Sequence, residues 1–258
     1  METLRNASVP SAMMGRPGGG TERVDIVITG GKIASIAPHA PGPGRDLDGG
    51  LVLPALVDIH THLDKGHIWP RRPNEDGTWE TALTRSIADT VERWSAPDVE
   101  RRMDFALRCA YAHGTAAIRT HIESTPPQHD ISWDVFERMR DKWAGRIELQ
   151  ATSLTGPLAV IDRPTLATVA ARVLHFDHPL DDAWSWARTV AGDAAKIAGF
   201  TYTAEIAVGA PADLLLFRAR TWTELLSRPQ SDRTVIRNGV AIDTTLPDYR
   251  ELDDLMEA

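Results

Sequence analysis

The sequence predicts an α/β protein, with β/α units in the middle of the chain and short strands at both ends. Between residues 51 and 154, strand-like apolar runs alternate with segments whose apolar residues recur at helical spacing. β-Branched runs lie near residues 24–37 and 234–242. The chain has 258 residues, 42% of them hydrophobic, which is enough for a sizeable core. Alternating strands and helices favour a parallel sheet.

The N-terminal part is predicted to begin with a mobile tail and continue as short strands. Residues 1–21 are rich in glycine, proline, serine and methionine, a composition typical of a tail. Residues 24–29 and 32–37 flank Gly30-Gly31, which predicts a hairpin. Further strands are expected over the ranges 51–53 and 56–60.

Helical spacing begins after residue 77. A first helix over 80–94 places four apolar residues on one face, which we expect to be buried: Leu83, Ile87, Val91 and Trp94. Ser95 is the expected N-cap of a second helix, which Gly114 ends. Its expected apolar face consists of Val99, Met103, Leu107, Ala110 and Tyr111.

The alternation continues with a strand over 115–122, a helix over 132–144 and a strand over 146–154. After residue 154 it stops. Two helices are predicted over 164–174 and 180–198. Strands follow over 212–217 and 234–242, the second with the turn Asn238-Gly239, and residues 246–258 are predicted to form a C-terminal tail.

Composition excludes several classes of protein. The net charge is -8 and no long basic block occurs, so a nucleic-acid partner is not expected. No run approaches 18 apolar residues and no signal peptide is evident, which predicts a soluble protein with no membrane association. The single cysteine, Cys109, excludes an intramolecular disulfide and is expected to be buried and inert, in keeping with a reducing cytoplasmic location.

The segment His60-Thr61-His62 carries the clearest chemical signal. It ends an apolar run, and side chains at positions i and i+2 of a strand point to the same face. Two imidazoles aimed at one point suit a divalent metal, so His60 and His62 are predicted metal ligands. A structural role without metal is the alternative.

Five segments together resemble the amidohydrolase superfamily, in its cytosine deaminase-like branch. Residues 51–65 carry the run that ends in His-Thr-His-Leu-Asp-Lys, and residues 119–123 read Arg-Thr-His-Ile-Glu. Residues 146–150 resemble the start of the next strand of that branch. Residues 208–216 and 235–239 resemble its closing segment. The likeness covers residues 22–155 and 181–243.

This resemblance implies a TIM-type (β/α) barrel beside a small β-sandwich built from residues 22–54 and 205–245. It also implies one divalent metal, zinc or iron. The metal activates water, which attacks a C–N carbon of a small heterocyclic substrate and releases ammonia. His121 and Glu123, at the end of the third-strand motif, are expected to contact that substrate. A packed role for His121 and a salt bridge or proton-shuttle role for Glu123 are the alternatives.

The barrel is predicted to be incomplete. A full barrel takes about 250 residues, more than the range 55–204 supplies, so an internal deletion near 155–180 is expected. The family's later histidine and its catalytic glutamate are not found, and the catalytic residues stay unassigned. His175, in His175-Phe176-Asp177-His178, is either a third ligand or part of a capping turn.

The expected metal-dependent C–N hydrolase is therefore predicted to bind its metal weakly and to be impaired. One alternative is a non-catalytic, metal-binding or oligomerising remnant, in which a second copy covers exposed strand edges. Another is a hydrolase of cyclic imides or lactams. Of the other polar residues, Lys65 is expected at the surface or near substrate, His113 as a helix cap, and His129 in a solvated loop.

Overall fold

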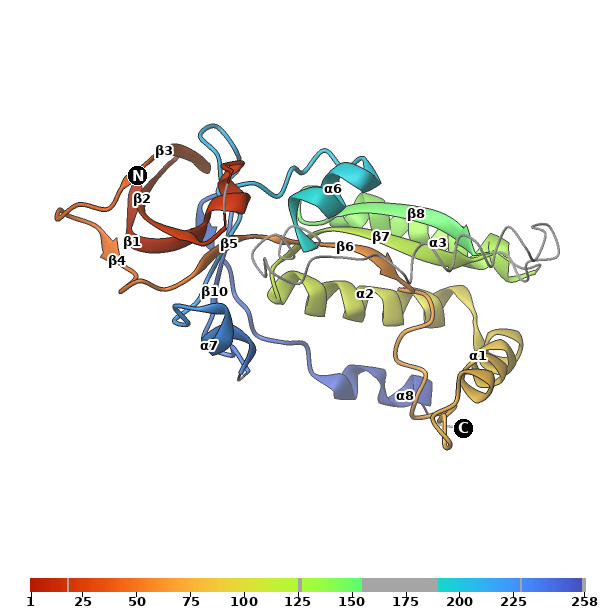
Figure 1. Cartoon of the computed structure of the whole chain (residues 1–258). Helices are drawn as coiled ribbons and strands as arrows, with labels where there is room; N and C mark the ends of the chain where they lie inside the picture. Colours follow the sequence, from red (N-terminus) through yellow and green to blue (C-terminus); the bar gives the residue numbers. More distant parts are fainter. Residues whose placement is uncertain (18, 125–126, 155–189, 228, 257–258) are drawn as a thin grey trace, which may run out of the picture.

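The computed structural model describes residues 1–17, 19–124, 127–154, 190–227 and 229–256. Its strands form three sheets, two at one end of the molecule and one at the other (Figure 1). The first sheet has the order β3-β2-β1-β4 and contains β1 (Glu2–Pro10), β2 (Thr21–Thr29), β3 (Lys32–Pro38) and β4 (Arg45–Asp46).

The second sheet joins strands from both halves of the chain. Its order is β11-β10-β9-β5, from β5 (Val52–Pro54), β9 (Leu214–Leu216), β10 (Thr234–Arg237) and β11 (Val240–Ala241). Buried residues of both sheets, among them Leu4, Ile26 and Leu214, belong to one hydrophobic core. The composite β-sandwich over 22–54 and 205–245 remains a prediction, although both chain ends contribute strands as expected.

The third sheet is parallel and has the order β6-β7-β8, from β6 (Leu56–Thr61), β7 (Thr115–Glu123) and β8 (Glu148–Leu154). The helices α2 (Ala96–Ala112) and α3 (Gln128–Trp143) pack on one face of it. The short helix α6 (Gly192–Ala198) packs against β6 on the other face. The predicted β/α units are thus present, and the described residues form an open three-stranded sheet.

The interior of this layer follows the predicted spacing. Val99, Met103 and Leu107 of α2 have no exposed surface. On α3, Val135, Phe136, Met139 and Trp143 are at most 2% exposed. The helix begins at Gln128, four residues earlier than predicted. The predicted helix over 164–174 and most of that over 180–198 lie outside the described residues, as does the expected deletion near 155–180.

The prediction of a mobile tail over 1–21 is wrong. Residues 2–10 of this segment form β1, which pairs with β2 in antiparallel and with β4 in parallel orientation, and a short 3-10 helix, η1 (Ser11–Met14), follows. Leu4, Ala7 and Val9 are fully buried. Pairing with strands more than ten residues away provides the burial that local composition did not indicate.

Within the predicted C-terminal tail over 246–258, the described residues 246–256 are not free. They contain a 3-10 turn, η3 (Tyr249–Leu252), and a short helix, α8 (Asp253–Met256). Arg101 and Arg108 of α2 form ion pairs of 2.6 and 2.5 Å with Asp254 and Glu251. Leu252 is 1% exposed, so this segment is docked on α2.

Helix α1 (Trp79–Arg93) lies where predicted. The prediction that its apolar face is buried is wrong. Thr78 caps it by accepting a hydrogen bond from the Thr81 N–H, and the following residue Trp94 is 5% exposed as expected. Leu83, Ile87 and Val91 are instead exposed to solvent. The polar side of the helix faces the protein because Asp89 is part of a buried ion network.

That buried ion network consists of Arg71, Asp89, Asp98 and Arg102. Arg71 donates to the Asp89 carboxylate from Nε and from Nη2, each at 2.8 Å. Its Nη1 donates to Asp98 at 2.6 Å. Arg102, fully buried, donates to Asp98 from Nε and Nη2 at 2.9 and 2.7 Å. The network joins α1, α2 and the loop that follows β6.

A short helix, α7 (Trp222–Leu226), completes the described elements. No helix in the described part of the chain combines the length and the apolar character needed to cross a membrane.

Candidate metal centre

The two histidines of the His-Thr-His segment lie where strand β6 ends. β6 pairs in parallel with β7, with an irregularity between Asp58 and Thr61. The Asp58 carboxylate accepts a hydrogen bond of 2.9 Å from the His60 N–H. His60 is exposed and His62 is half-buried, so solvent reaches the pair.

His121, near the end of β7, lies against both of them. Its ring centroid is 4.3 Å from that of His60 and 5.4 Å from that of His62, and the rings of His60 and His62 are 5.5 Å apart. His60, His62 and His121 are called the histidine cluster below. The strand register explains it, because Thr61 is paired with Thr120, which places the ends of the two strands side by side.

The loop after His62 is held to β7 by side-chain contacts. The Leu63 N–H donates to the Thr120 hydroxyl at 3.0 Å, and that hydroxyl donates to the Thr61 carbonyl at 3.3 Å. Arg102 reinforces the loop from the other side by donating to the backbone carbonyls of Asp64 and Gly66 at 2.5 and 2.9 Å. The histidine-bearing segment is therefore fixed by buried polar contacts.

Asp64 is a buried carboxyl that sequence reasoning passed over. It is fully buried, and its Oδ2 accepts a hydrogen bond of 2.8 Å from the Glu123 N–H, while Oδ1 has no partner. Burial raises the pKa of Asp64 to about 6. Its position two residues after His62 in the same motif was the available signal.

Glu123 is held by Lys65. The Lys65 ammonium lies 2.9 Å from the Glu123 carboxylate, and both side chains are mostly buried. The salt-bridge alternative for Glu123 is thus present in the structure. Its role as a substrate contact, like that of His121, remains a prediction.

The protonation states of His62 and His121 suit metal binding. Burial, followed by the charge of Lys65, lowers the pKa of His62, and burial, followed by the charge of His60, lowers the pKa of His121. Both imidazoles are therefore neutral near pH 7, as a ligand must be. His62 Nδ1 lies 3.2 Å from the His121 carbonyl, so that a donated hydrogen bond leaves Nε2 as the free lone pair.

The imidazole nitrogens of the histidine cluster are donors that suit a divalent metal. The present arrangement of the three rings is only partly suited to holding one. His121 Nδ1 is buried and has no hydrogen-bond partner, which is costly unless something binds it. Within the described ranges, no three histidine, cysteine or acidic side chains are arranged to hold a metal ion together. His175, the other predicted candidate, lies outside those ranges.

The remaining singled-out residues have ordinary roles. His113 follows α2, and its Nδ1 lies 2.7 Å from the Cys109 carbonyl, as expected of a cap. His129 lies 3.2 Å from Asp130 at the start of α3, so the prediction of a loop position is wrong. Cys109 is half-buried and not fully buried as expected; burial raises the pKa of its thiol.

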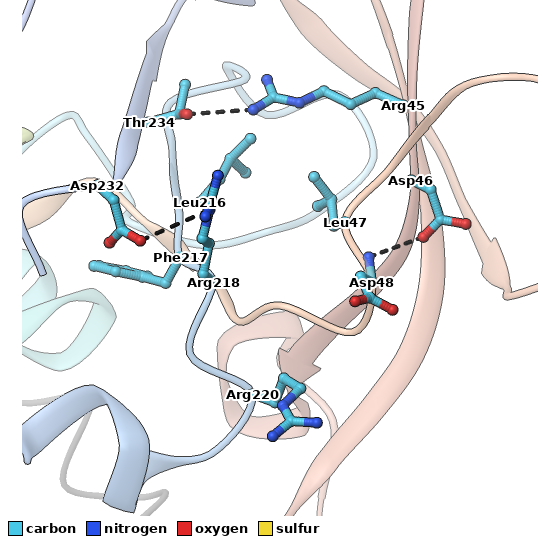
Figure 2. A pocket seen from close by; sticks show the side chains of 10 residues that line it. All are labelled: Arg45, Asp46, Leu47, Asp48, Leu216, Phe217, Arg218, Arg220, Asp232 and Thr234. Atoms are coloured by element: carbon cyan, nitrogen blue, oxygen red, sulfur yellow. Dashed lines mark hydrogen bonds and ion pairs between the residues drawn. The ribbon is translucent and has the colours of Figure 1, made fainter.

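A pocket of about 490 Å³ lies away from the cluster, between β4 and the strands β9 and β10 (Figure 2). Three arginines and three aspartates line it, so their formal charges cancel. Arg45 donates to the Thr234 hydroxyl at 3.3 Å, and Arg218 pairs with Asp232 at 3.7 Å. None of the cluster histidines lines this pocket, which therefore does not belong to the candidate metal centre.

No model of a known protein family matches the chain. The chain is 31% identical to a pterin deaminase of Rhizobium rhizogenes over an alignment of 425 positions, which covers 99% of this chain and 97% of that protein. Since this chain has 258 residues, the alignment contains long gaps on its side. A stretch of 52 residues is 44% identical to a dihydroorotase of Mycobacterium tuberculosis, covering 19% of this chain and 12% of that protein.

Two solved structures are similar to part of the chain. A 5-methylcytosine deaminase from Klebsiella pneumoniae, liganded with 5-fluorocytosine, has 22% identity and a TM-score of 0.47, covering 58% of this chain and 36% of that one. An N-isopropylammelide isopropylaminohydrolase from Burkholderia multivorans has 25% identity and a TM-score of 0.41, covering 67% and 43%. The chain thus spans less than half the length of either solved structure.

Proposed function

Because this chain belongs to the amidohydrolase superfamily, and to its deaminase-like branch, we propose that it is a metal-dependent hydrolase of C–N bonds in a small heterocycle. The proposed substrate is a cyclic amidine of the nucleobase or pterin type. The observation that carries the proposal is the meeting of three imidazoles where two parallel strands end. The pterin deaminase relative supports the substrate class.

In this proposal, His60 and His62 hold one zinc or iron ion, and His121 is the nearest further imidazole. Zinc sites generally use three or four protein ligands, so a site that rests on two is expected to bind weakly. When bound, the metal lowers the pKa of a water molecule toward neutrality and thereby supplies the nucleophile.

The protein's own contribution is to hold these rings in place. The His121 carbonyl orients His62, and the Thr120 hydroxyl anchors the loop that follows it. Asp64 keeps the end of β7 in place by accepting from the Glu123 N–H. His121 and Glu123 stay the proposed substrate contacts.

We also propose that the activity is impaired. A hydrolytic deaminase needs a group that passes protons from water to the leaving amine. The nearest carboxylate that sequence reasoning considered for this task, Glu123, is paired with Lys65. The short chain, set against the long alignment with its deaminase relative, supports the same view.

Two alternative functions are distinguished by experiment. One is a non-catalytic remnant that binds metal or oligomerises. The other is hydrolysis of a cyclic imide or lactam, which is favoured by the 52-residue likeness to a dihydroorotase.

Metal content per chain tests the metal proposal directly. The purified protein, loaded with zinc and desalted, is compared with the double variant His60→Ala/His62→Ala. A second double variant, His113→Ala/His129→Ala, removes two histidines elsewhere and serves as the control. We expect partial occupancy that is lost only in the first variant. Equal zinc in all three proteins would refute the site, and a full equivalent lost from the first variant would reveal a more complete ligand set.

Ammonia release from pterin, cytosine and isocytosine tests the activity. We expect rates no higher than those of free metal. Release above that background, abolished by His60→Ala/His62→Ala, would overturn the claim of impairment while supporting the deaminase assignment. A cyclic imide and a lactam in the same panel separate the second alternative from deamination.

A further inference from the structure

Helix α1 presents an apolar stripe to solvent. Trp79, Leu83, Ile87 and Val91 are 72, 41, 55 and 80% exposed. These residues, called the α1 stripe below, recur every four positions and so lie on one side of the helix. The helix lies at the periphery of the fold, at the opposite end from the two four-stranded sheets (Figure 1).

The orientation of α1 is fixed by its polar side. Asp89 has no exposed surface and accepts hydrogen bonds from Arg71 and from the Trp94 indole, the latter at 2.7 Å. Turning the stripe inward would take this carboxylate away from its partners, at a cost typical of a broken buried ion pair. The stripe is therefore held outward, where an amphipathic helix normally carries polar residues.

We propose that the α1 stripe is the interface with a second copy of this chain, formed by two antiparallel α1 helices about a two-fold axis. Even spacing makes the stripe complementary to itself, as a two-fold interface requires. With the axis at the level of residue 85, Trp79 meets the partner's Val91 and Leu83 meets the partner's Ile87. Each large side chain thus lies opposite a smaller or equal one.

The residues beside the stripe permit this approach. Ala82, Thr84, Ser86 and Thr90 are small and uncharged. In the antiparallel arrangement, Glu80 lies at the level of the partner's Thr90, so that no like charges oppose each other.

The exposed area is compatible with a weak, specific dimer. A tryptophan side chain alone contributes about 150–250 Å². Two copies of the stripe would together bury on the order of 1,000 Å², the lower limit for a specific interface. We therefore expect a dissociation constant in the micromolar range. A lipid surface suits the stripe less well, because the net charge of the chain is -8 and membrane-surface helices are typically basic.

Sedimentation velocity on the full chain, from about 1 to 100 µM, tests the interface. We expect a concentration-dependent dimer in the unmodified protein. Ile87→Glu buries a charge in the proposed contact and should weaken dimerisation at least tenfold. Ile197→Glu is the matched control, because Ile197 lies on helix α6 and is 77% exposed. Circular dichroism of each variant checks that it is folded.

Cross-linking tests the register. In a Cys109→Ser background, the double substitution Leu83→Cys/Ile87→Cys should give a covalent dimer under mild oxidation, with each new thiol facing its counterpart. A protein that stays monomeric at the highest concentration would overturn the proposal. So would a dimer that Ile87→Glu leaves unchanged, since it would have to form through another surface such as the edges of the parallel sheet.

Discussion

The histidine cluster and the buried ion network lie on either side of the loop that follows β6. They differ in how completely their polar atoms are hydrogen-bonded. In the network, Arg71 donates to both carboxylates and Arg102 donates to Asp98, and all four side chains are nearly or fully buried. In the cluster, His60 is exposed and His121 Nδ1 is buried without a partner.

This difference separates two uses of buried charge and polarity. A fully paired network holds elements in a defined orientation, and removing one member leaves the others unpaired. An incompletely paired group is retained when it has another partner to bind, which is our interpretation of the cluster.

Replacing Arg71 should have the largest effect on stability. Arg71→Leu leaves Asp89 and Asp98 with fewer partners and also removes the hydrogen bond of 3.0 Å to the Leu255 carbonyl. We expect a loss of about 3–5 kcal/mol in the free energy of unfolding, measured in urea. Arg138→Leu breaks an exposed pair with Glu100 and should cost less than about 1 kcal/mol. Equal losses in both variants would contradict the contrast.

Lowering the pH should have the second-largest effect on stability, because it protonates Asp98 in the network. Burial raises the pKa of Asp98, but the hydrogen bonds from Arg71 and Arg102 outweigh it, so the pKa in the folded protein lies below the usual 3.8. The unfolded chain therefore takes up this proton first as pH falls. Stability from Asp98 is present above about pH 4 and is lost below it, by about 1.4 kcal/mol for each pH unit that separates the folded and unfolded pKa values.

The variant Asp98→Asn tests this pH dependence. It should be less stable than the unmodified protein at pH 7, and its free energy of unfolding should fall less steeply between about pH 5 and pH 2. Urea unfolding at several pH values measures both effects. A slope as steep as that of the unmodified protein would contradict the assignment to Asp98.

A smaller effect is expected at the hydroxyl that anchors the cluster. Thr120→Val keeps the shape of a fully buried side chain but leaves the Leu63 N–H without its acceptor. We expect a loss of about 1–2 kcal/mol in the free energy of unfolding. Amide hydrogen exchange of Leu63 should become faster while that of Val99 in α2 changes no more than global stability requires. Unchanged protection at Leu63 would mean that the hydroxyl is not its acceptor.

The smallest effect is expected within the cluster itself. His60→Ala in metal-free protein should change the free energy of unfolding by no more than about 0.5 kcal/mol, because the ring is exposed. Zinc should raise the melting temperature of the unmodified protein and not that of this variant. A large destabilisation without metal would show that His60 is structural.

Sequence reasoning identified most elements of the α/β layer because their spacing is local. Met103 and Leu107 of α2, and Met139 and Trp143 of α3, lie on the buried sides that the helical period indicated. The pair His60 and His62 stood out for the same reason, because the two residues are two positions apart at the end of one strand.

Features that depend on distant partners were missed. Strand β1 is buried by pairing with β2, and neither its composition nor its neighbours reveal this. The face of α1 was assigned by apolarity, whereas Asp89 and Arg71, 18 residues apart, decide it. His121 was expected near substrate; its contact with both other histidines follows from the register of β6 with β7, which spacing alone does not fix.

Pairing between β5 and β9 has a consequence for synthesis on the ribosome. Val52 lies opposite Leu216, and Leu53 opposite Leu215. Strand β5, which is synthesised early, therefore cannot pair until β9 has been synthesised. Arg237 of β10 then donates to the carbonyls of Thr115, the first residue of β7, and of Arg146, two residues before β8, at 3.1 and 2.8 Å.

At typical translation rates of about 5–20 residues per second, β5 is exposed for on the order of ten seconds or more before β9 emerges. During this interval its apolar run is an unpaired strand edge. The nascent chain should therefore engage folding chaperones until residue 237 has left the exit tunnel, and a stalled chain that ends before β9 should be more sensitive to protease than the released protein.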